Sequence, residues 1–139
     1  MPEHTQTDIR RLGPGDEAVV RHFAESTPRT ALLEDERTIF LAAFQGGRPV
    51  GFALGYELPR RHGNASILFV YELEVEPDCQ RRGIASRLML ELRRIAGARG
   101  CAESFVLTEP ENDAANALYA SLGGQRVETV MWDFGSAGG

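Results

Sequence analysis

The chain has 139 residues, of which 42% are hydrophobic and 25% charged, the composition of an ordinary globular protein with room for one core. Its formal net charge of −5 argues against the basic surface that nonspecific nucleic-acid binding needs. No apolar run approaches the roughly 20 residues of a membrane-spanning helix. Two cysteines without a secretory leader favour a cytoplasmic protein. We therefore expect one domain over residues 1–139 that binds neither nucleic acid nor a membrane.

The first third of the chain predicts a strand, a helix and a loop. Thr7–Leu12 is the first strand, and the Gly-Pro-Gly that follows ends it. Asp16 is the expected cap of a helix that runs to about Ser26. Residues 26–36 predict a loop with a short helix.

The middle of the chain predicts three successive strands, over residues 38–45, 50–58 and 67–75. Gly46 and Gly47 join the first two in a tight hairpin turn, because both glycines tolerate a positive φ. In the strand 50–58, large apolar residues alternate with Gly and Ala. Another element can therefore pack closely on the small-residue face of this strand.

The last third predicts helix, strand, helix and strand, over residues 84–99, 103–108, 112–122 and 126–134. The helix 84–99 has an apolar stripe at helical spacing, and Gly100 stands where a left-handed stop is expected. Asn112 is the expected cap of the second helix, which Gly123 ends. The element order predicts an α/β or α+β sheet with helices on both faces.

A turn between a strand and the long helix is the strongest indication of function. It reads Gln80-Arg81-Arg82-Gly83-Ile84-Ala85. A helix N-terminus presents unpaired N–H groups and partial positive charge, and Gly83 allows the backbone to approach a ligand closely. This arrangement suits a pyrophosphate, although a plain surface turn with solvated arginines remains the alternative.

These motifs resemble the acetyl-CoA signature of the GNAT superfamily of N-acetyltransferases. The first block is Gln80-x-x-Gly83-x-Ala85, and the second is Asn112-x-x-Ala115-x-x-Leu118-Tyr119. The resemblance covers residues 38–134. It implies the GNAT fold, an α/β (α+β) arrangement whose mixed, mostly antiparallel sheet splays at the acetyl-CoA site and carries helices on both faces.

The resemblance also implies a donor site made mostly of backbone groups. A strand splays at a bulge and pairs with the pantetheine arm, and the pyrophosphate lies on the turn. The residues that match these roles are Leu73, Glu74, Val75, Gln80, Arg81, Arg82, Gly83, Ile84, Ala85, Ser86, Asn112, Ala115 and Tyr119.

Two residues match the catalytic roles of the family. Tyr119 corresponds to the general acid that protonates the departing thiolate, with a core tyrosine as the alternative. Glu72 is the expected base for the acceptor amine, directly or through water, with its side chain opposite Tyr71 and Leu73. The expected substrate-binding carboxylates are Glu57, Glu72, Glu109 and Glu111. The three histidines lack metal-ligand spacing, so no metal is implied.

Within the superfamily, the chain looks most similar to small aminoglycoside 3-N-acetyltransferases. The stretch before Thr38 is short for these relatives, which leaves the acceptor open. The prediction is acetyl transfer from acetyl-CoA to a small-molecule amine, first of all the 3-amino group of an aminoglycoside antibiotic, in a possible homodimer. The alternatives are a peptide, polyamine or other small amine as acceptor, a non-catalytic acyl-CoA-binding regulatory module, and a plain α/β domain without coenzyme A.

Overall fold

A computed structural model describes residues 6–136 of the chain. The chain divides after Leu107 into two compact units, which we describe separately. The single domain that we predict from the sequence stays a prediction. No helix in the described part of the chain is long and apolar enough to cross a membrane.

A five-stranded sheet organises the first unit, with the strands in chain order from one edge to the other. The pairs from β1 to β4 are antiparallel, and only β4 and β5 run parallel. The strands are β1 (Thr7–Arg11), β2 (Thr38–Gln45), β3 (Arg48–Pro59), β4 (Ser66–Val75) and β5 (Cys101–Val106). This is the mixed, mostly antiparallel sheet that the sequence predicts.

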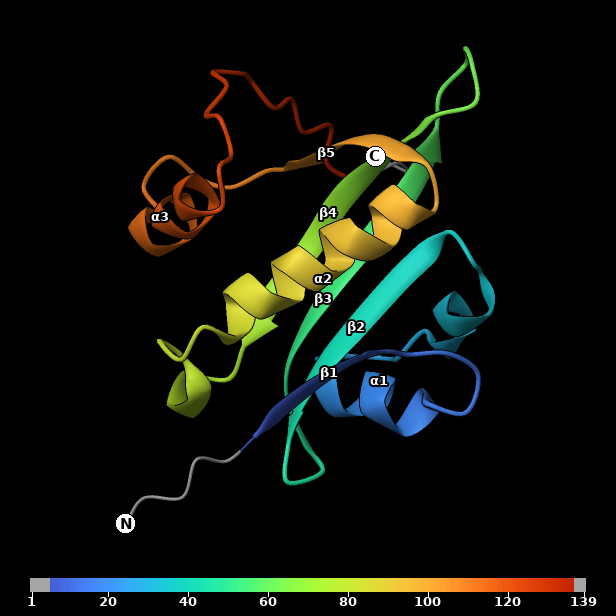
Figure 1. The fold of residues 1–139 in the computed structure, drawn as a ribbon, viewed down its shortest axis with the longest axis vertical. Helices are drawn as coiled ribbons and strands as arrows, with labels where there is room; N and C mark the ends of the chain where they lie inside the picture. The colour runs from blue at the N-terminus through green and yellow to red at the C-terminus, as the bar shows by residue number, and fades with distance from the viewer. Residues whose placement is uncertain (1–5, 137–139) are drawn as a thin grey trace. The chain divides into compact units, whose positions relative to one another are not determined.

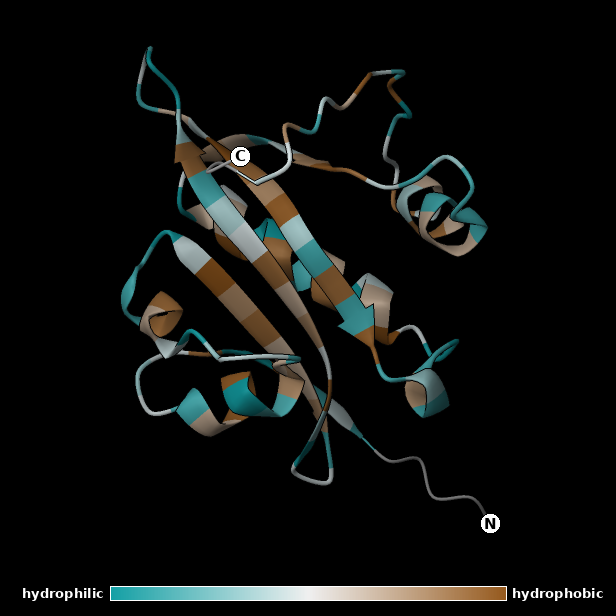
Figure 2. Ribbon diagram, turned by 180° about the vertical axis from the view of Figure 1, so that it is seen from behind, coloured by the Kyte–Doolittle hydropathy of each residue, from teal (hydrophilic) through white to brown (hydrophobic). Residues whose placement is uncertain are grey.

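Helices lie on both faces of this sheet (Figures 1 and 2). The long helix α2 (Ile84–Ala98) contacts all five strands from one side. The short helix α1 (Glu17–Phe23) and the turn η1 (Thr30–Glu34) lie on the other side, against β2 and β3. On that side neither of them lies in front of β4 or β5 (Figure 2). A single turn of helix, η2 (Pro77–Cys79), connects β4 to α2.

The two faces of β3 differ as its alternating sequence predicts. On the face toward α2, a Cβ built on Gly55 would lie 2.8 Å from Leu68 Cδ1 and 3.2 Å from Leu92 Cδ1, which leaves no room for a side chain. On the other face, Phe52 and Leu54 form a buried cluster with residues of α1, η1 and β2. The strand is therefore fixed on the helix by its small residues and presents its large ones to the opposite side.

Two element boundaries and one helix cap are among the differences from the sequence expectation. Helix α1 ends at Phe23 because Ala24 is already extended. Asp16 makes no side-chain cap to the helix; its carboxylate accepts a hydrogen bond from the N–H of Gly13 and pairs with Arg10. Strand β5 begins at Cys101, directly after Gly100, whose φ of +97° reverses the chain at the end of α2.

The second unit contains the helix α3 (Asp113–Ser121), and both of its predicted ends are confirmed. The Asn112 side chain accepts a hydrogen bond from the N–H of Ala115 at 3.1 Å, and Gly123 has a φ of +88°. The predicted strand over 126–134 was wrong: residues 124–136 form no strand. Isolated extended backbone is not a stable strand, and the described part of this unit offers no second strand to pair with it.

Candidate active site

Strand β4 has an open edge where the sequence predicts the sheet to splay. Its pairing with β5 ends at Val70, whereas its pairing with β3 on the other side continues to Val75. The segment 71–75 therefore has no strand partner on its β5 side within the described residues. Of the backbone groups of Leu73, Glu74 and Val75, those that point to this side are available to an extended ligand that adds itself as a strand, apart from the Val75 carbonyl oxygen, which accepts a hydrogen bond from Gln80.

A β-bulge lies at the start of this open segment. Leu54 pairs with Glu72 and the next residue, Gly55, pairs with Val70, so Tyr71 is an extra residue in β4. The Tyr71 ring lies 5.6 Å from the ring of Tyr56, and Tyr56 packs on the face that carries α1. The expectation that Glu72 points away from Tyr71 was wrong, because the bulge interrupts the alternation and brings both side chains to one face.

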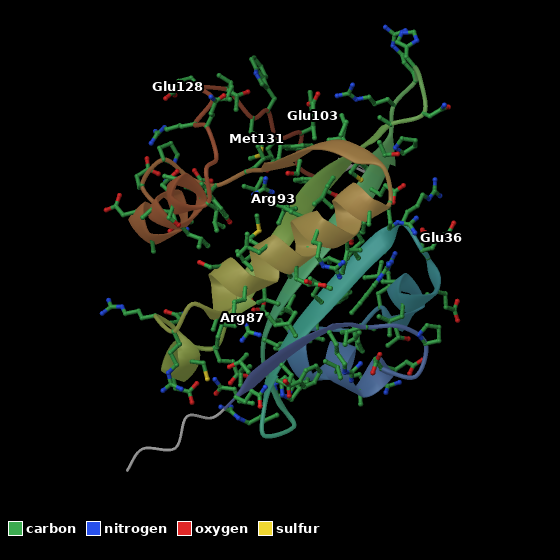
Figure 3. The ribbon with its side chains drawn as sticks, in the orientation of Figure 1. Glu36, Arg87, Arg93, Glu103, Glu128 and Met131 are labelled. Carbon is green, nitrogen blue, oxygen red and sulfur yellow. The ribbon has the colours of Figure 1, made fainter. Side chains whose placement is uncertain are left out.

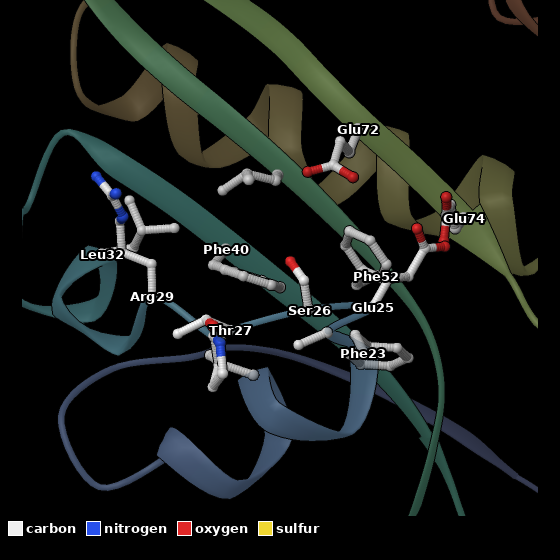
Figure 4. A pocket seen from close by; sticks show the side chains of 14 residues that line it. Phe23, Glu25, Ser26, Thr27, Arg29, Leu32, Phe40, Phe52, Glu72 and Glu74 are labelled. Carbon is white, nitrogen blue, oxygen red and sulfur yellow. The ribbon is translucent and has the colours of Figure 1, made fainter.

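A pocket of about 230 Å³ lies on this face, beside the open edge of β4 (Figure 4). Its apolar wall comes from β2, β3 and α1 and includes Phe23, Phe40 and Phe52. The segment 24–29 closes it from the side, and Glu25, Glu72 and Glu74 supply three carboxylates. An apolar wall with a few converging carboxylates suits a small organic cation.

The local environment makes Glu72 a weaker acid than an ordinary glutamate. Partial desolvation raises the pKa of its carboxyl, and the negative charges of Glu74 and Glu25 raise it further. Glu72 nevertheless stays open to solvent from the pocket. A carboxylate with a raised pKa binds a proton more readily near neutral pH, as a general base for an amine must.

The predicted phosphate turn is present at the start of α2. Gly83 precedes the helix with a φ of +79°, and Arg81 also has a positive φ, of +65°. Within the described part of the chain, no acceptor is found for the backbone N–H groups of residues 81–86. Successive unpaired N–H groups at a helix N-terminus form a binding site for anions. Arg81 and Arg82 are exposed beside them.

Side chains connect the turn to the sheet. Gln80 donates a hydrogen bond to the carbonyl oxygen of Val75 at 3.0 Å, which ties the turn to the open end of β4. Arg87 donates to the carbonyl oxygen of Thr7 at 2.9 Å (Figure 3), so it anchors α2 to the first strand. Arg81 and Arg82, by contrast, make no side-chain hydrogen bond or ion pair within the described part of the chain, so their guanidinium groups are free to face a phosphate.

A model of the family described as "Acetyltransferase (GNAT) family" matches residues 7–123. The chain belongs to this family. The predicted fold is confirmed, and the predicted enzyme class, an N-acetyltransferase, and donor, acetyl-CoA, are confirmed at the level of the family. The open edge of β4 and the unpaired N–H groups of the turn fit the two halves of coenzyme A, an amide-bearing arm and a pyrophosphate.

Three relatives of this GNAT chain illustrate its similarities. An acetyltransferase of Yersinia enterocolitica is 33% identical over 71% of the chain, and the chain spans 66% of that relative's length. The aminoglycoside N(6′)-acetyltransferase type 1 of Salmonella enteritidis is 25% identical over 94% of the chain and 89% of the relative. The crystal structure of an aminoglycoside acetyltransferase from an uncultured soil metagenomic sample superposes with a TM-score of 0.85, at 31% identity over 95% of this chain and 99% of that one. The likeness to aminoglycoside acetyltransferases is thus supported, but the Salmonella relative is named for position 6′ rather than 3.

The other predicted residues of the GNAT site lie in different surroundings. Glu57 binds Arg99 at 2.7 Å, with only 11% of its side chain exposed, and it does not line the pocket. Asn112 uses its side-chain oxygen to cap α3, which also contains Ala115.

Burial raises the pKa of Tyr119, so its phenol holds its proton at neutral pH. Glu109 and Glu111 are exposed residues of the second unit. The roles proposed for all of these residues stay predictions.

Several pocket residues were missed from the sequence. Phe23, Glu25 and Arg29 lie in or beside a segment without periodicity, which gave no indication of a binding wall. Tyr56, which packs beside the pocket wall without lining the pocket, was assigned only to the apolar face of its strand. One indication of an aromatic surface here was present in the sequence: β3 contains Tyr56, and β4 contains Phe69 and Tyr71 close to Glu72.

Proposed function

We propose that this protein transfers the acetyl group of acetyl-CoA to a primary amine of a small cationic molecule, first of all an aminoglycoside. One observation carries the proposal: Glu72, a carboxylate with a raised pKa, lines an acidic pocket directly beside the open backbone edge of β4. Donor and acceptor would therefore meet at one strand.

The donor would be held by backbone groups of this chain. Leu73, Glu74 and Val75 would pair with the pantetheine arm along the open edge, and the N–H groups of residues 81–86 would bind the pyrophosphate. When bound, acetyl-CoA supplies an activated thioester. A backbone N–H of the open segment would stabilise the negative charge that develops on the thioester oxygen.

Glu72 and Tyr119 would handle the protons. An alkyl ammonium group has a pKa near about 10.4, so it must lose a proton before it can attack. Glu72 would accept that proton directly or through a water molecule, while Glu25 and Glu74 hold the remaining positive charge of the acceptor. Tyr119 would donate its phenolic proton to the departing thiolate, and its raised pKa keeps the phenol protonated until that step.

The identity of the acceptor is the most specific part of the proposal. The carboxylates of the pocket favour a molecule with several ammonium groups, and two of the relatives above are named as aminoglycoside acetyltransferases. The sequence favours transfer to the 3-amino group, whereas the Salmonella relative is named for position 6′. A cytoplasmic location, supported by the free thiols of Cys79 and Cys101, and a homodimer belong to the same proposal.

A thiol-release assay over a panel of aminoglycosides, polyamines and peptides tests this function. We expect acetyl-CoA-dependent thiol release with aminoglycosides, and NMR of the product then assigns the acetylated nitrogen. Preferential turnover of a peptide or polyamine would show that the acceptor belongs to that class and not to the aminoglycosides. Binding of acetyl-CoA by calorimetry without thiol release for any amine would instead support a non-catalytic regulatory module.

A further inference from the structure

Four aromatic rings form a continuous row across β3, β4 and β5. Tyr56 and Tyr71 lie with their ring centres 5.6 Å apart, and Tyr71 and Phe69 lie 5.8 Å apart, both pairs edge to face. Phe69 then stacks on Phe105 at 4.8 Å with the ring planes only 5° apart. We call these four residues the aromatic row.

The row lies on the same face of the sheet as the pocket and continues from it. Tyr56 packs against the buried cluster that includes Phe52 and Leu54, and both of these residues line the pocket. Tyr71 follows in β4, directly before Glu72. The first ring of the row therefore adjoins the pocket wall, and the second adjoins the proposed base.

Two of the four rings are open to solvent. Tyr71 is 57% exposed and Phe105 is 42% exposed, although both are large rings in a sheet. The helix α1 and the turn η1, which cover the β2 and β3 side of this face, do not lie in front of β4 or β5 (Figure 2). Exposed aromatic rings that continue a polar pocket are typical of a ligand-binding surface.

We propose that the aromatic row is a second acceptor subsite, which binds the face of an additional amine-bearing ring when the reacting amine lies at Glu72. This inference rests on the proposed function and defines its substrate class as acceptors with at least two rings. The C–H face of a saturated ring would lie on the Tyr71 ring, and an ammonium group on it would gain from the electron-rich ring face. The carboxylates of Glu25, Glu72 and Glu74 carry the charge that attracts such an acceptor.

The bulge gives the row its position. Without the extra residue in β4, Tyr71 and Glu72 would point to opposite faces of the sheet, because side chains alternate along a strand. The bulge brings both to the pocket side, so the same irregularity serves the chemistry at Glu72 and the contact at Tyr71.

The test uses neamine, which has two rings, together with its two one-ring halves, 2-deoxystreptamine and a methyl 2,6-diamino-2,6-dideoxyglucoside. The measured quantity is the ratio of kcat/KM for neamine to that for the better half. In Tyr71→Leu we expect this ratio to fall about five- to tenfold through a higher KM for neamine, with the one-ring values unchanged. Tyr71→Phe retains the ring and should retain the ratio. Phe105→Leu, at the edge strand, should lower it less and provides a second variant should Tyr71→Leu fail to fold.

Several results would overturn the inference. An unchanged ratio in both leucine variants, or an equal loss for one-ring and two-ring acceptors, would remove the row from acceptor binding while the proposed function stands. A change of oligomeric state in sedimentation would assign the row to a contact between two copies of the chain. If the wild-type protein acetylates none of the three amines, the proposed function fails and the subsite fails with it.

Discussion

The proposed donor site lies along the open edge of β4, and the proposed acceptor pocket lies beside it on the face of the sheet that carries α1. The two sites are built differently. The proposed donor edge, residues 73–75 and 80–86, offers backbone N–H and C=O groups, so most of its side chains can vary. The pocket is built from side chains of α1, η1, β2, β3 and β4 and from a segment without regular structure. A backbone site depends on a few positions of special conformation, whereas a side-chain site depends on the identity of each residue that lines it. Single substitutions should therefore change acetyl-CoA binding or amine turnover without changing the other.

The largest separation should come from Glu72→Gln. The amide cannot accept the acceptor's proton, so we expect kcat to fall about 100-fold or more, while acetyl-CoA affinity measured by calorimetry stays the same. As the proposed base, Glu72 would act in its deprotonated form, and the pKa of its carboxyl is raised. Activity should therefore be lost, as the pH falls, at a higher pH than an ordinary glutamate would give. A variant with wild-type kcat would exclude Glu72 as the base.

A substitution in the shared scaffold should damage both sites together. In Gly55→Ala the new methyl group would lie 2.8 Å from Leu68 and displace it or Leu92, and we expect the free energy of unfolding in urea to fall by about 1–3 kcal/mol. Gly97→Ala is the matched control, since its Cβ meets nothing within 4 Å on α2. This control should stabilise the protein by about 0.5–1 kcal/mol. Equal stability of the two variants would show that the face between β3 and α2 is not tightly packed.

The donor edge alone should respond to Gly83→Val. A β-branched residue is strained at a φ of +79°, at a cost of about 1–2 kcal/mol, so the turn would change its conformation. We expect acetyl-CoA to bind roughly tenfold more weakly in calorimetry, with little change in the KM for the amine. The space around this position is open, so backbone conformation and not crowding is the cause. Wild-type affinity in this variant would mean that the turn does not hold the pyrophosphate.

The smallest effect should come from Glu25→Gln in the pocket. Loss of one partly solvated charge should raise the KM of a cationic acceptor only about two- to fivefold, and less at high salt. Because the Glu25 charge raises the pKa of Glu72, the acid limb of the pH profile should also move to lower pH. If the KM rises while the acid limb of the pH profile stays in place, the charge of Glu25 does not raise the pKa of Glu72, and this part of the prediction is wrong.

The same contrast explains what the sequence could predict. The turn at Gln80–Ser86 and the strands of the first unit follow local rules, because glycine, capping residues and alternation act within a few positions. The direction of Glu72 relative to Tyr71 was predicted incorrectly, since the bulge depends on pairing with the distant strand β3. The cap role of Asp16 was also predicted incorrectly, because its carboxylate binds the nearby Arg10 and Gly13 instead of the helix. The segment 126–134 has strand-forming residues but no strand partner within its own unit. The wall at residues 24–29 has no local pattern at all, so only the tertiary structure shows it.

The tight fit of Gly55 against α2 also bears on how this protein could diverge. Because an atom added at Gly55 would collide with Leu68 and Leu92, inherited change should be easier on the opposite face of β3 and in residues 24–29, which belong to no strand. New acceptors could thus be acquired by successive replacements there, without loss of the helix-packed framework. Laboratory evolution for a different amine should accumulate its substitutions on that side of the strand.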